Sequence, residues 1–579
     1  MCGIAGVVSA NGDEISLYLN TMLKSMQHRG PDGAGIMIGG EVQHEDKLED
    51  LDFAKKGKIG LGHVRLAITG GALGLQPFQS KDGKLSLLHN GEIYNYKKLR
   101  QELSNETQFE TNTDSEVIIR LTEKHYQGNL TDAFQKILPQ LDGVWAIAIT
   151  DNEQTIIARD KLGVRQIYYH INQNTITFAS EKKPLWAISG KDADIKRLLP
   201  GHMAVLNDSG IKDIIFWSSE SIKPDDHIEN RKEAIETYGK AIQEAVRKRI
   251  DGKDHVGIIF SGGIDSFLIA YEVQKLGVGF TCYTAGREGA TDIQWAIELA
   301  NQYNFPLKVK MLSVDDIEKL IPEIIQDIED YSLNQVEVSV PIYASVRMAQ
   351  ENGERVILSG QGADELFGGY PWYPTIVDRE GYESFEKYSW DDAFLLYKEC
   401  LEREDKISMA HSIELRVPFL DPEVVKVAFR ISPKLKIDKD NDSLGKRTHR
   451  EYCVSRGIPE TIAFRMKEAA QHGANVHNAF EELANRKRIS ATELDAAGYD
   501  PNQTVTEKLG SSSRYGYRYG DHHLWKPLPQ VQYYLDSVAN SLDLLLPAPK
   551  QHIDKVNQKL EELSSIGQKG LQVRRGVVT

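Results

Sequence analysis

The sequence lacks several features that would place the protein in a specialised class. No apolar run in its 579 residues approaches the roughly 18 residues that a membrane-spanning helix needs, and no basic segment followed by an apolar one opens the chain. Only 4 cysteines are present, too few for a disulfide framework and too scattered for a local zinc pattern. We therefore expect a cytoplasmic protein in a reducing compartment, with no membrane partner.

Positive charge is also scarce, since 69 Lys and Arg against 84 Asp and Glu give a net charge of −15. A nucleic-acid partner needs a basic stripe, so this balance argues against one. A hydrophobic fraction of 41% and a charged fraction of 26% are ordinary, and the length predicts about three or four domains. Composition does not identify protein partners, and a homodimer stays open.

A phosphate-binding loop is expected in HVGIIFSGGIDS (255–266), although the lysine of a Walker A loop is missing. The apolar run predicts a strand, the glycines a tight turn, and the residues from Asp265 a helix. Backbone N–H groups of the turn, the serine hydroxyls and the helix N-terminus would bind phosphate. The alternative is a plain strand–turn–helix connection with Asp265 as a helix cap.

This interpretation also predicts a metal, because an acidic side chain facing a polyphosphate requires a cation between the two. Asp265 therefore indicates Mg²⁺. The string SGGIDS resembles the pyrophosphate-binding loop of the ATP-dependent adenylating synthetases, which implies ATP as the nucleotide. The predicted nucleotide-binding residues are Phe260, Ser261, Gly262, Gly263, Asp265, Ser266, Ser359 and Gly360.

A cysteine follows the first methionine. Removal of the methionine, which is usual before a small residue, would leave Cys2 with a thiol and an α-amine. An α-amine with a pKa of about 7.7–8.0 can act as general base for its own side chain. The alternative is that Cys2 is only a small buried residue.

Four later strings resemble the class II glutamine amidotransferase domain in order and spacing. They are HRGPDG (28–33), GHVRLAI (62–68), HNGEIYN (89–95) and TDSE (113–116). The resemblance implies that Cys2 attacks the glutamine amide to form a thioester. Each string also has a plainer interpretation, because TDSE suits a helix N-cap and Asn90-Gly91 suits a hairpin turn.

The resemblance assigns a role to each polar residue of these strings. Arg65 would bind the α-carboxylate of glutamine, and Asp114, helped by Glu92, would bind its α-ammonium. The Gly91 N–H and the Asn90 side chain would stabilise the tetrahedral oxyanion.

Two domains of different fold are predicted. Tandem apolar runs with few helices between them predict antiparallel sheets in residues 1–210, and the resemblance implies an αββα sandwich of the N-terminal nucleophile type. Residues 211–230 have a loose, polar pattern that predicts a linker. Helices alternate with apolar runs in 231–540, which predicts an α/β adenylating domain with a doubly wound parallel sheet. Residues 541–579 are a C-terminal extension without an assigned role.

A second segment should join the nucleotide site, because ligands of such sheets bind at the carboxyl ends of strands. SGQGADELFGGY (359–370) follows the predicted strand RVILSG. Its Asp364 offers a second oxygen ligand for Mg²⁺ opposite Asp265. A glycine-rich turn with a capping aspartate is the alternative.

These strings, with SIELRVPFLD (412–421) and FRMKEAAQHGANV (464–476), resemble glutamine-hydrolysing asparagine synthetases over roughly residues 1–535. The resemblance implies ATP-dependent amidation of aspartate by ammonia from glutamine, through a β-aspartyl-adenylate, with an internal passage for ammonia. Lys467 would stabilise developing negative charge, and Gln361 and Arg416 would contact aspartate. Many members have Glu where this chain has Gln361, so this position lacks the usual carboxylate.

Two other functions stay open. An enzyme of the same superfamily could amidate a different carboxylate, and a glutamine- and nucleotide-sensing homologue could bind both ligands without turnover. A binding module needs no nucleophile, so Cys2 favours an enzyme.

Overall fold

The structure is a computed structural model that describes residues 2–12, 14–68, 74–440, 444–466, 468–499, 517–519, 522–524 and 528–542. The chain forms two compact units. The first comprises Met1–Ile222 and Tyr397–Glu414, and the second comprises Lys223–Leu396 and Leu415–Thr579. The sequence predicted that each domain is one continuous stretch of chain. In the structure, Tyr397–Glu414 belongs to the first unit although it lies within the predicted second domain.

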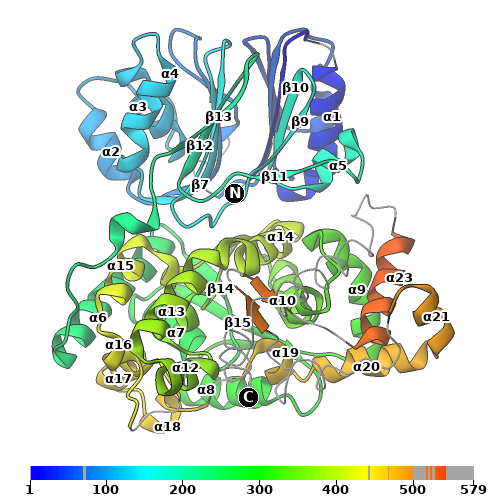
Figure 1. The fold of residues 1–579 in the computed structure, drawn as a ribbon. Coiled ribbons are helices and arrows are strands. Elements are labelled where there is room, and N and C mark those ends of the chain that lie inside the picture. The colour runs from blue at the N-terminus through cyan, green and yellow to red at the C-terminus, as the bar shows by residue number, and fades with distance from the viewer. Residues whose placement is uncertain are drawn as a thin grey trace. The chain divides into compact units, whose positions relative to one another are not determined.

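The first unit contains two antiparallel sheets (Figure 1). The seven-stranded sheet has the order β11-β9-β10-β1-β4-β2-β3, and the six-stranded sheet has the order β13-β12-β8-β7-β6-β5. The strands of the first sheet are β1 (Cys2–Ser9), β2 (Ala34–Ile38), β3 (Glu41–Glu45), β4 (Ile59–Arg65), β9 (Tyr168–Asn172), β10 (Thr175–Ala179) and β11 (Lys196–Arg197). Those of the second are β5 (Phe78–Gln79), β6 (Ser86–Ile93), β7 (Gly143–Thr150), β8 (Thr155–Arg159), β12 (His202–Asn207) and β13 (Gly210–Ile215).

Helices cover the outer faces of both sheets, which confirms the predicted αββα sandwich (Figure 1). Alternation along β1 shows how one strand serves two layers. Ala5 and Val7 pack in the cluster that includes α1, whereas Ile4 and Val8 pack in the cluster between the sheets. The helices are α1 (Ile15–Ser25) and α5 (Lys183–Ser189) on one side, and α2 (Tyr96–Leu103), α3 (Ser115–His125) and α4 (Leu130–Ile137) on the other.

Strand β13 includes residues 211–215 of the predicted linker. It pairs with β12 over its whole length, from Asn207↔Gly210 to His202↔Ile215. Asp208 and Ser209 form the turn between the two strands, and Gly210 directly after them has φ of 115°, a conformation that suits glycine. The sandwich therefore extends to residue 215, because a hairpin partner stabilises a strand whose own pattern is weak.

The second unit has a five-stranded sheet in the order β16-β15-β14-β17-β18. Strand β14 is parallel to both β15 and β17, and β15 is parallel to β16. The strands are β14 (His255–Ile259), β15 (Gly279–Gly286), β16 (Leu307–Met311), β17 (Val356–Leu358) and β18 (Glu414–Arg416). The chain runs outward from β14 to β16 and then returns to β17, so the strand order reverses at β14.

This reversal confirms a doubly wound sheet and locates its ligand crevice. Right-handed crossovers place α7 (Ile264–Lys275) and α8 (Thr291–Tyr303) on one face, and α9 (Val314–Ile328) and α10 (Leu333–Glu351) on the other. Ligands of such sheets bind where the order reverses, at the carboxyl ends of the strands. The loops after β14 and β17 lie there, and both were predicted to bind the nucleotide.

The remaining described elements are mostly short helices. They are α6 (Arg231–Ile250), α11 (Ala363–Phe367), α12 (Trp372–Glu380), α13 (Tyr382–Leu396), α14 (Glu402–Ala410), α15 (Pro422–Arg430), α16 (Pro433–Lys436), α17 (Arg447–Ser455), α18 (Glu460–Ala463), α19 (Ala470–Gly473), α20 (His477–Arg486), α21 (Ala491–Ala496) and α23 (Pro529–Ser541), with the hairpin of β19 (Tyr517–Tyr519) and β20 (His522–Leu524). None of the helices that the structure describes has the length and apolar character needed to cross a bilayer.

Candidate active sites

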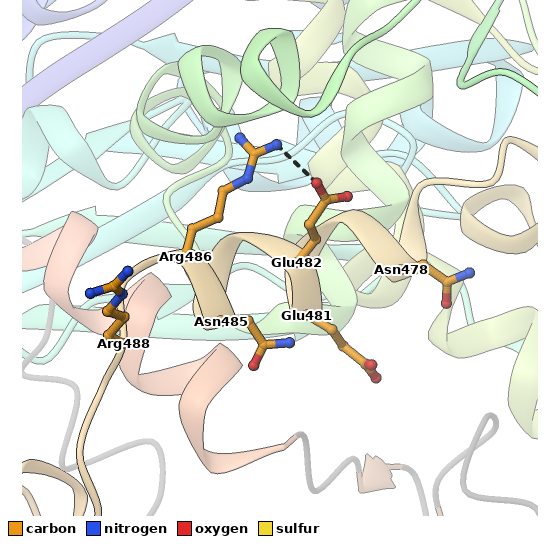
Figure 2. A pocket seen from close by; sticks show the side chains of 6 residues that line it. All are labelled: Asn478, Glu481, Glu482, Asn485, Arg486 and Arg488. Atoms are coloured by element: carbon orange, nitrogen blue, oxygen red, sulfur yellow. Dashed lines mark hydrogen bonds and ion pairs between the residues drawn. The ribbon is translucent and has the colours of Figure 1, made fainter.

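An open hollow of about 720 Å³ lies along α20, as Figure 2 shows. Its lining is polar: Asn478, Glu481, Glu482, Asn485, Arg486 and Arg488. An ion pair of 2.8 Å between Arg486 and Glu482 occupies part of it. No residue predicted to act in binding or catalysis lines this hollow. The candidate sites are therefore sought where those predicted residues lie in each unit.

Cys2 and Asn90 meet in the first unit, where β1 begins beside β6. The Cys2 backbone nitrogen donates a hydrogen bond of 3.0 Å to Asn90 Oδ1. The other end of the same amide, Asn90 Nδ2, is buried and has no hydrogen-bond partner. An unpartnered buried donor costs free energy, so its orientation beside Cys2 indicates a place for an oxygen ligand.

Arg65 lies next to Cys2 because β1 and β4 pair in the register Cys2↔Arg65. Only 5% of Arg65 is exposed. A Cβ added to Gly74 would come within 2.4 Å of its Nη2 atom, so residue 74 must be glycine for the guanidinium to stay in place. The predicted carboxylate-binding cation is thus held against the predicted nucleophile.

Asp114 is the acidic residue of this site. Its Oδ2 atom accepts a hydrogen bond of 2.9 Å from the Ile93 N–H, and its side chain makes no capping bond to α3. Burial, and then the charge of Glu92, raise the pKa of Asp114 to about 8. Two acidic groups held close together away from water suit a cationic ligand.

The hairpin interpretation of Asn90-Gly91 is wrong, because the pair lies inside β6. The string TDSE does lie at the start of α3, where Thr113 Oγ1 accepts a hydrogen bond of 3.4 Å from the Glu116 N–H, whereas the Asp114 side chain makes no capping bond. A strand therefore positions Asn90, and a helix start positions Asp114.

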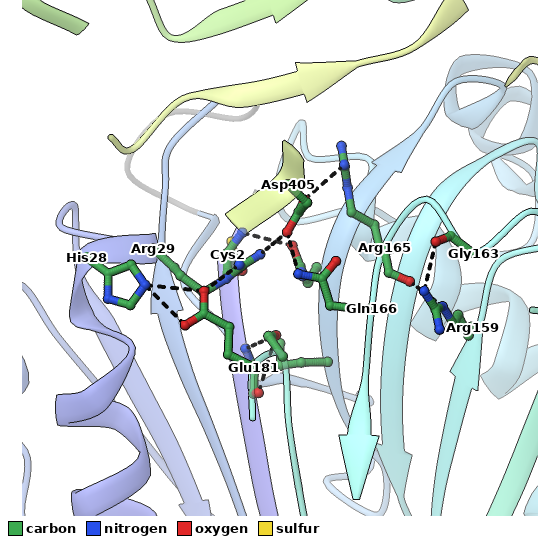
Figure 3. Close-up of polar contacts among 12 residues, drawn as sticks. Cys2, His28, Arg29, Arg159, Gly163, Arg165, Gln166, Glu181 and Asp405 are labelled. Atoms are coloured by element: carbon green, nitrogen blue, oxygen red, sulfur yellow. Dashed lines mark hydrogen bonds and ion pairs between the residues drawn. The ribbon is translucent and has the colours of Figure 1, made fainter. Parts of the chain in front are cut away.

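Helix α14 contributes to the first unit through a buried charge network (Figure 3). Asp405 Oδ2 accepts hydrogen bonds from Arg29 Nη2 at 2.9 Å and from Gln166 Nε2 at 2.8 Å. Asp405 Oδ1 lies 3.1 Å from Arg165 Nη1. Arg29 also donates to the Cys2 carbonyl at 3.2 Å and to Glu181 at 2.8 Å. One guanidinium therefore connects the backbone of Cys2 to α14.

A second carboxylate of α14 strengthens the attachment. Glu402 lies 2.9 Å from Arg197 Nε and accepts a hydrogen bond of 2.6 Å from the Tyr168 hydroxyl. Burial alone would raise the pKa of Glu402, but Arg197 and Arg159 lower it to about 2. Arg159 has a structural role as well, because it donates to three backbone carbonyls, those of Gly163, Arg165 and Leu198.

In the second unit, the loop after β14 has the predicted strand–turn–helix form. Gly262 has φ of 68°, and a Cβ there would lie 2.7 Å from the Ala296 backbone nitrogen, so both conformation and space require glycine. Ser261 Oγ accepts a hydrogen bond of 3.3 Å from the Gly263 N–H. Helix α7 begins at the next residue, Ile264, with its N-terminus at the loop.

The loop after β17 approaches this loop closely. A Cβ on Gly360 would lie 3.0 Å from Asp265 Cβ and 3.2 Å from the Ser266 nitrogen. Ser359 donates its N–H to the Arg416 carbonyl at 3.0 Å, which ties the loop to β18. The two strings that predicted one nucleotide site are therefore adjacent in the structure.

Lys446 lies between the two predicted metal ligands and was not singled out from the sequence. Its Nζ atom is 2.6 Å from Asp265 Oδ2 and 2.7 Å from Asp364 Oδ1. His449 Nε2 is 3.2 Å from Asp265 Oδ1. Burial lowers the pKa of Lys446, and the Asp265 carboxylate opposes that shift. No motif in the sequence marks this lysine, because it becomes part of the site only through tertiary structure.

The carboxylates of Asp265 and Asp364 fit a Mg²⁺ ion that binds together with a nucleotide. Oxygens of Asp265 and Asp364 converge on one cationic atom, which shows that both can face one ion. Within the described part of the chain, no group of three or more His, Cys, Asp or Glu side chains could hold a metal. Mg²⁺ commonly binds to one or two carboxylates plus substrate phosphates, which is the donor set available here.

The remaining predicted residues are less informative. Arg416 is 1% exposed and donates from Nη1 to the Arg249 carbonyl at 2.5 Å. Gln361 is partly exposed in the turn before α11. Lys467 lies outside the described residues.

Comparison with known families matches the whole of this arrangement. A model described as glutamine amidotransferase domain matches residues 1–236, and one described as asparagine synthase matches residues 237–383 and 377–536. The chain belongs to the asparagine synthase family. The first match includes Cys2 and Asn90, and the second includes Asp265 and Asp364.

Relatives of this family match nearly the full length. A Methanocaldococcus jannaschii protein provisionally named glutamine-hydrolyzing asparagine synthetase 1 is 34% identical over 86% of this chain and 97% of its own. The glutamine-hydrolyzing asparagine synthetase of Sandersonia aurantiaca is 29% identical over 88% of this chain and 94% of its own. Glutamine-hydrolyzing asparagine synthetase B of Escherichia coli is 28% identical, with 88% and 89% covered.

Proposed function

We propose that this chain makes asparagine from aspartate, with ATP as the energy source and with ammonia taken from glutamine. Membership of the asparagine synthase family supports this reaction. The geometric observation that supports it most directly is the buried Asn90 Nδ2 donor beside Cys2, which a glutamine-derived oxyanion would satisfy. The other residues of the first unit's site suit glutamine hydrolysis, and those of the second unit's site suit the ATP-dependent steps.

In the first unit, Arg65 would hold the glutamine α-carboxylate, and Asp114 and Glu92 the α-ammonium, which places the side-chain amide at Cys2. The Cys2 sulfur adds to the amide carbon, and the resulting oxyanion takes hydrogen bonds from Asn90 Nδ2 and the Gly91 N–H. The α-amine of a processed Cys2 takes the thiol proton as the sulfur attacks and gives it to the leaving nitrogen when the C–N bond breaks, so that ammonia is released. Water then hydrolyses the thioester to glutamate.

In the second unit, the loop of Ser261 to Ser266 would bind the phosphates of ATP at the N-terminus of α7. The aspartate β-carboxylate attacks the α-phosphorus, forming β-aspartyl-adenylate and pyrophosphate. Ammonia then attacks the acyl carbon, giving asparagine and AMP. Lys467 would stabilise negative charge during these steps, and Gln361 and Arg416 would orient aspartate.

Asp265 and Asp364 would hold Mg²⁺ in this site. When bound, the ion neutralises the phosphate oxygens and helps pyrophosphate to leave. The two carboxylates would therefore bind the nucleotide through the metal. Without the nucleotide, their contacts with Lys446 hold them close together.

One assay tests the proposal. The protein is incubated with ATP, Mg²⁺, glutamine and each of a panel of carboxylates, and pyrophosphate, AMP and the amidated product are measured. We expect pyrophosphate and AMP to form in step with asparagine, and only with aspartate. Preference for another carboxylate would identify a different amidotransferase, and binding of glutamine and ATP without pyrophosphate would identify a sensing protein.

A further inference from the structure

The expected phosphate loop lacks a lysine, yet a buried lysine stands at its edge. Lys446 is 1% exposed, and its ammonium contacts the two carboxylates of Asp265 and Asp364 at 2.6–2.8 Å. Asp265 lies in the first turn of α7, directly after the loop that follows β14, and Asp364 lies in α11, which follows β17. The lysine therefore joins the two segments that follow the strand ends at the ligand crevice.

The surrounding backbone is shaped to hold this side chain. Lys446 has φ of 56°, an unfavourable conformation for a residue with a side chain, and its N–H donates to the Phe367 carbonyl at 3.0 Å. A Cβ on Gly369 would lie 2.0 Å from Lys446 Cε and 2.1 Å from Asp364 Oδ1. Gly445, with φ of 66°, has no room for a Cβ because the Gly368 carbonyl would be 1.9 Å away. Two glycines and a strained residue therefore fix one ammonium at one point.

The stability of the fold alone does not explain why a lysine is buried between two carboxylates. Moving a lysine and two carboxylates out of water is costly, and buried ion pairs often stabilise no better than apolar residues would. The arrangement has a different consequence, because it keeps two negative groups compensated while no metal is bound. The same carboxylates are the ones that fit Mg²⁺.

We propose that the Lys446 ammonium occupies the cation position between Asp265 and Asp364 in the nucleotide-free protein and leaves it when Mg²⁺ binds with ATP. The released ammonium then faces the phosphates and supplies the positive charge that the SGGIDS loop lacks. The inference rests on the proposed function only in taking Asp265 and Asp364 as the Mg²⁺ ligands. It makes metal binding depend on nucleotide, because a divalent ion alone must displace a well-held lysine.

Mn²⁺ binding tests this without any turnover. Free Mn²⁺ is measured by electron paramagnetic resonance in a titration of the full chain, with and without pyrophosphate. For the unmodified protein, we expect binding at this site to be weak alone and at least about tenfold tighter with pyrophosphate. Equally tight Mn²⁺ binding without pyrophosphate would overturn the proposal. This measurement uses only the unmodified protein, so it does not depend on whether a variant folds.

Lys446→Gln provides the second arm. Removing the ammonium leaves the two carboxylates to the metal, so we expect Mn²⁺ to bind without pyrophosphate at least about tenfold more tightly than in the unmodified protein. Lys446→Gln combined with Asp364→Asn should lose that gain. Lys434→Gln, at an exposed lysine of α16, is the matched control and should change nothing.

Pyrophosphate binding completes the test. In the presence of Mg²⁺, Lys446→Gln should weaken it and Lys446→Arg should restore part of the loss. A Lys446→Gln variant with unchanged Mn²⁺ and pyrophosphate affinities would show that the lysine only ties α17 to the loop. Neither measurement involves glutamine or aspartate, so a failure here is distinguishable from a failure of the proposed reaction.

Discussion

Arg29 Nη2 lies 2.9 Å from Asp405 Oδ2, although 376 residues separate the two in sequence. The same guanidinium donates to the Cys2 carbonyl, so the position of the proposed nucleophile depends on α14, a helix from a later part of the chain that belongs to the first unit. The pair is completely buried on both sides. It therefore links the stability of the first unit to the geometry of its active site.

Asp405→Ala should destabilise the protein and lower glutaminase activity. Arg29 and Arg165 would each lose one carboxylate partner away from water, and removing one partner of a buried ion pair typically costs about 3–5 kcal/mol. Chemical denaturation followed by fluorescence, together with the rate of glutamine hydrolysis, would measure both effects. Glu102→Gln, at an exposed acid on α2 that lies 3.8 Å from Lys98, should stay within about 0.5 kcal/mol. Equal effects of the two changes would contradict the role given to Asp405.

Cys2→Ala should abolish asparagine formation from glutamine and leave formation from added ammonium salts. The thiol is the proposed nucleophile, whereas ATP and aspartate would react in the second unit. Parallel assays with glutamine and with ammonium chloride provide the measurement. Cys453→Ala, at another buried cysteine, is the control and should keep both activities. Loss of the ammonia-dependent reaction in Cys2→Ala would disprove the division of labour between the units.

Asn90→Ala should lower kcat for glutamine hydrolysis by about 10²–10³ while changing KM much less. Asn90 Nδ2 is the donor proposed for the oxyanion, and loss of one such donor usually costs a factor of this size. A steady-state comparison at saturating and limiting glutamine separates the two constants. Because Asn90 Oδ1 also accepts from the Cys2 nitrogen, Asn90→Asp keeps that acceptor and removes the donor. It should be as slow as Asn90→Ala, and a fast aspartate variant would exclude the oxyanion role.

Glutamine binding should weaken as the pH falls below about 8. Burial and Glu92 raise the pKa of Asp114 to about 8, so below that pH its carboxyl group is protonated in the ligand-free protein and attracts an ammonium poorly. The glutamine Kd of Cys2→Ala, measured by calorimetry between pH 6 and 8, should rise as the pH falls, by up to about tenfold per unit. Adding Asp114→Asn should give weak binding at every pH. A Kd independent of pH over this range would contradict the assignment.

Local signals in the sequence predicted the fold well where each element forms its own pattern. The apolar run, paired glycines and helix start of 255–266 predicted strand, turn and helix in the order observed, and tandem apolar runs predicted antiparallel strands in residues 1–210, where β1, β7 and β10 lie. The edge strand β13 was missed because hairpin pairing, and not its own pattern, stabilises it.

Two parts of the sites could not be predicted, for different physical reasons. Glu402–Lys406 are five consecutive charged residues, a pattern typical of an exposed helix, yet all five are buried, and Glu402 and Asp405 pair with side chains from distant segments. Lys446 is distinguished by its ammonium position and by φ of 56°, and neither has a sequence signature. By contrast, Cys2 was singled out because it follows the first methionine, and Arg65, Asn90 and Asp114 because each stands in a string that carries the family resemblance.

The last prediction concerns Gln361, where the chain departs from the family pattern. A carboxylate at this position could accept a proton when ammonia attacks the acyl-adenylate, whereas a neutral amide cannot. That attack produces an ammonium-like intermediate acidic enough to pass its proton to an adenylate oxygen, so a hydrogen-bonding amide that orients the acyl group should suffice. Loss of an orienting hydrogen bond costs about 0.5–1.5 kcal/mol, at most about tenfold in rate, whereas loss of a general base costs about 10²–10⁴.

Gln361→Ala should therefore lower the ammonia-dependent rate of asparagine formation by about tenfold, and Gln361→Glu should not raise it. Single-turnover measurements with preformed adenylate isolate this step from pyrophosphate release, and the glutaminase rate of the same variants is the internal control. A hundredfold loss in the alanine variant, or a clear gain in the glutamate variant, would mean that this position takes part in proton transfer. An effect near tenfold would instead show that the amidation step needs orientation here and finds its base on the substrate.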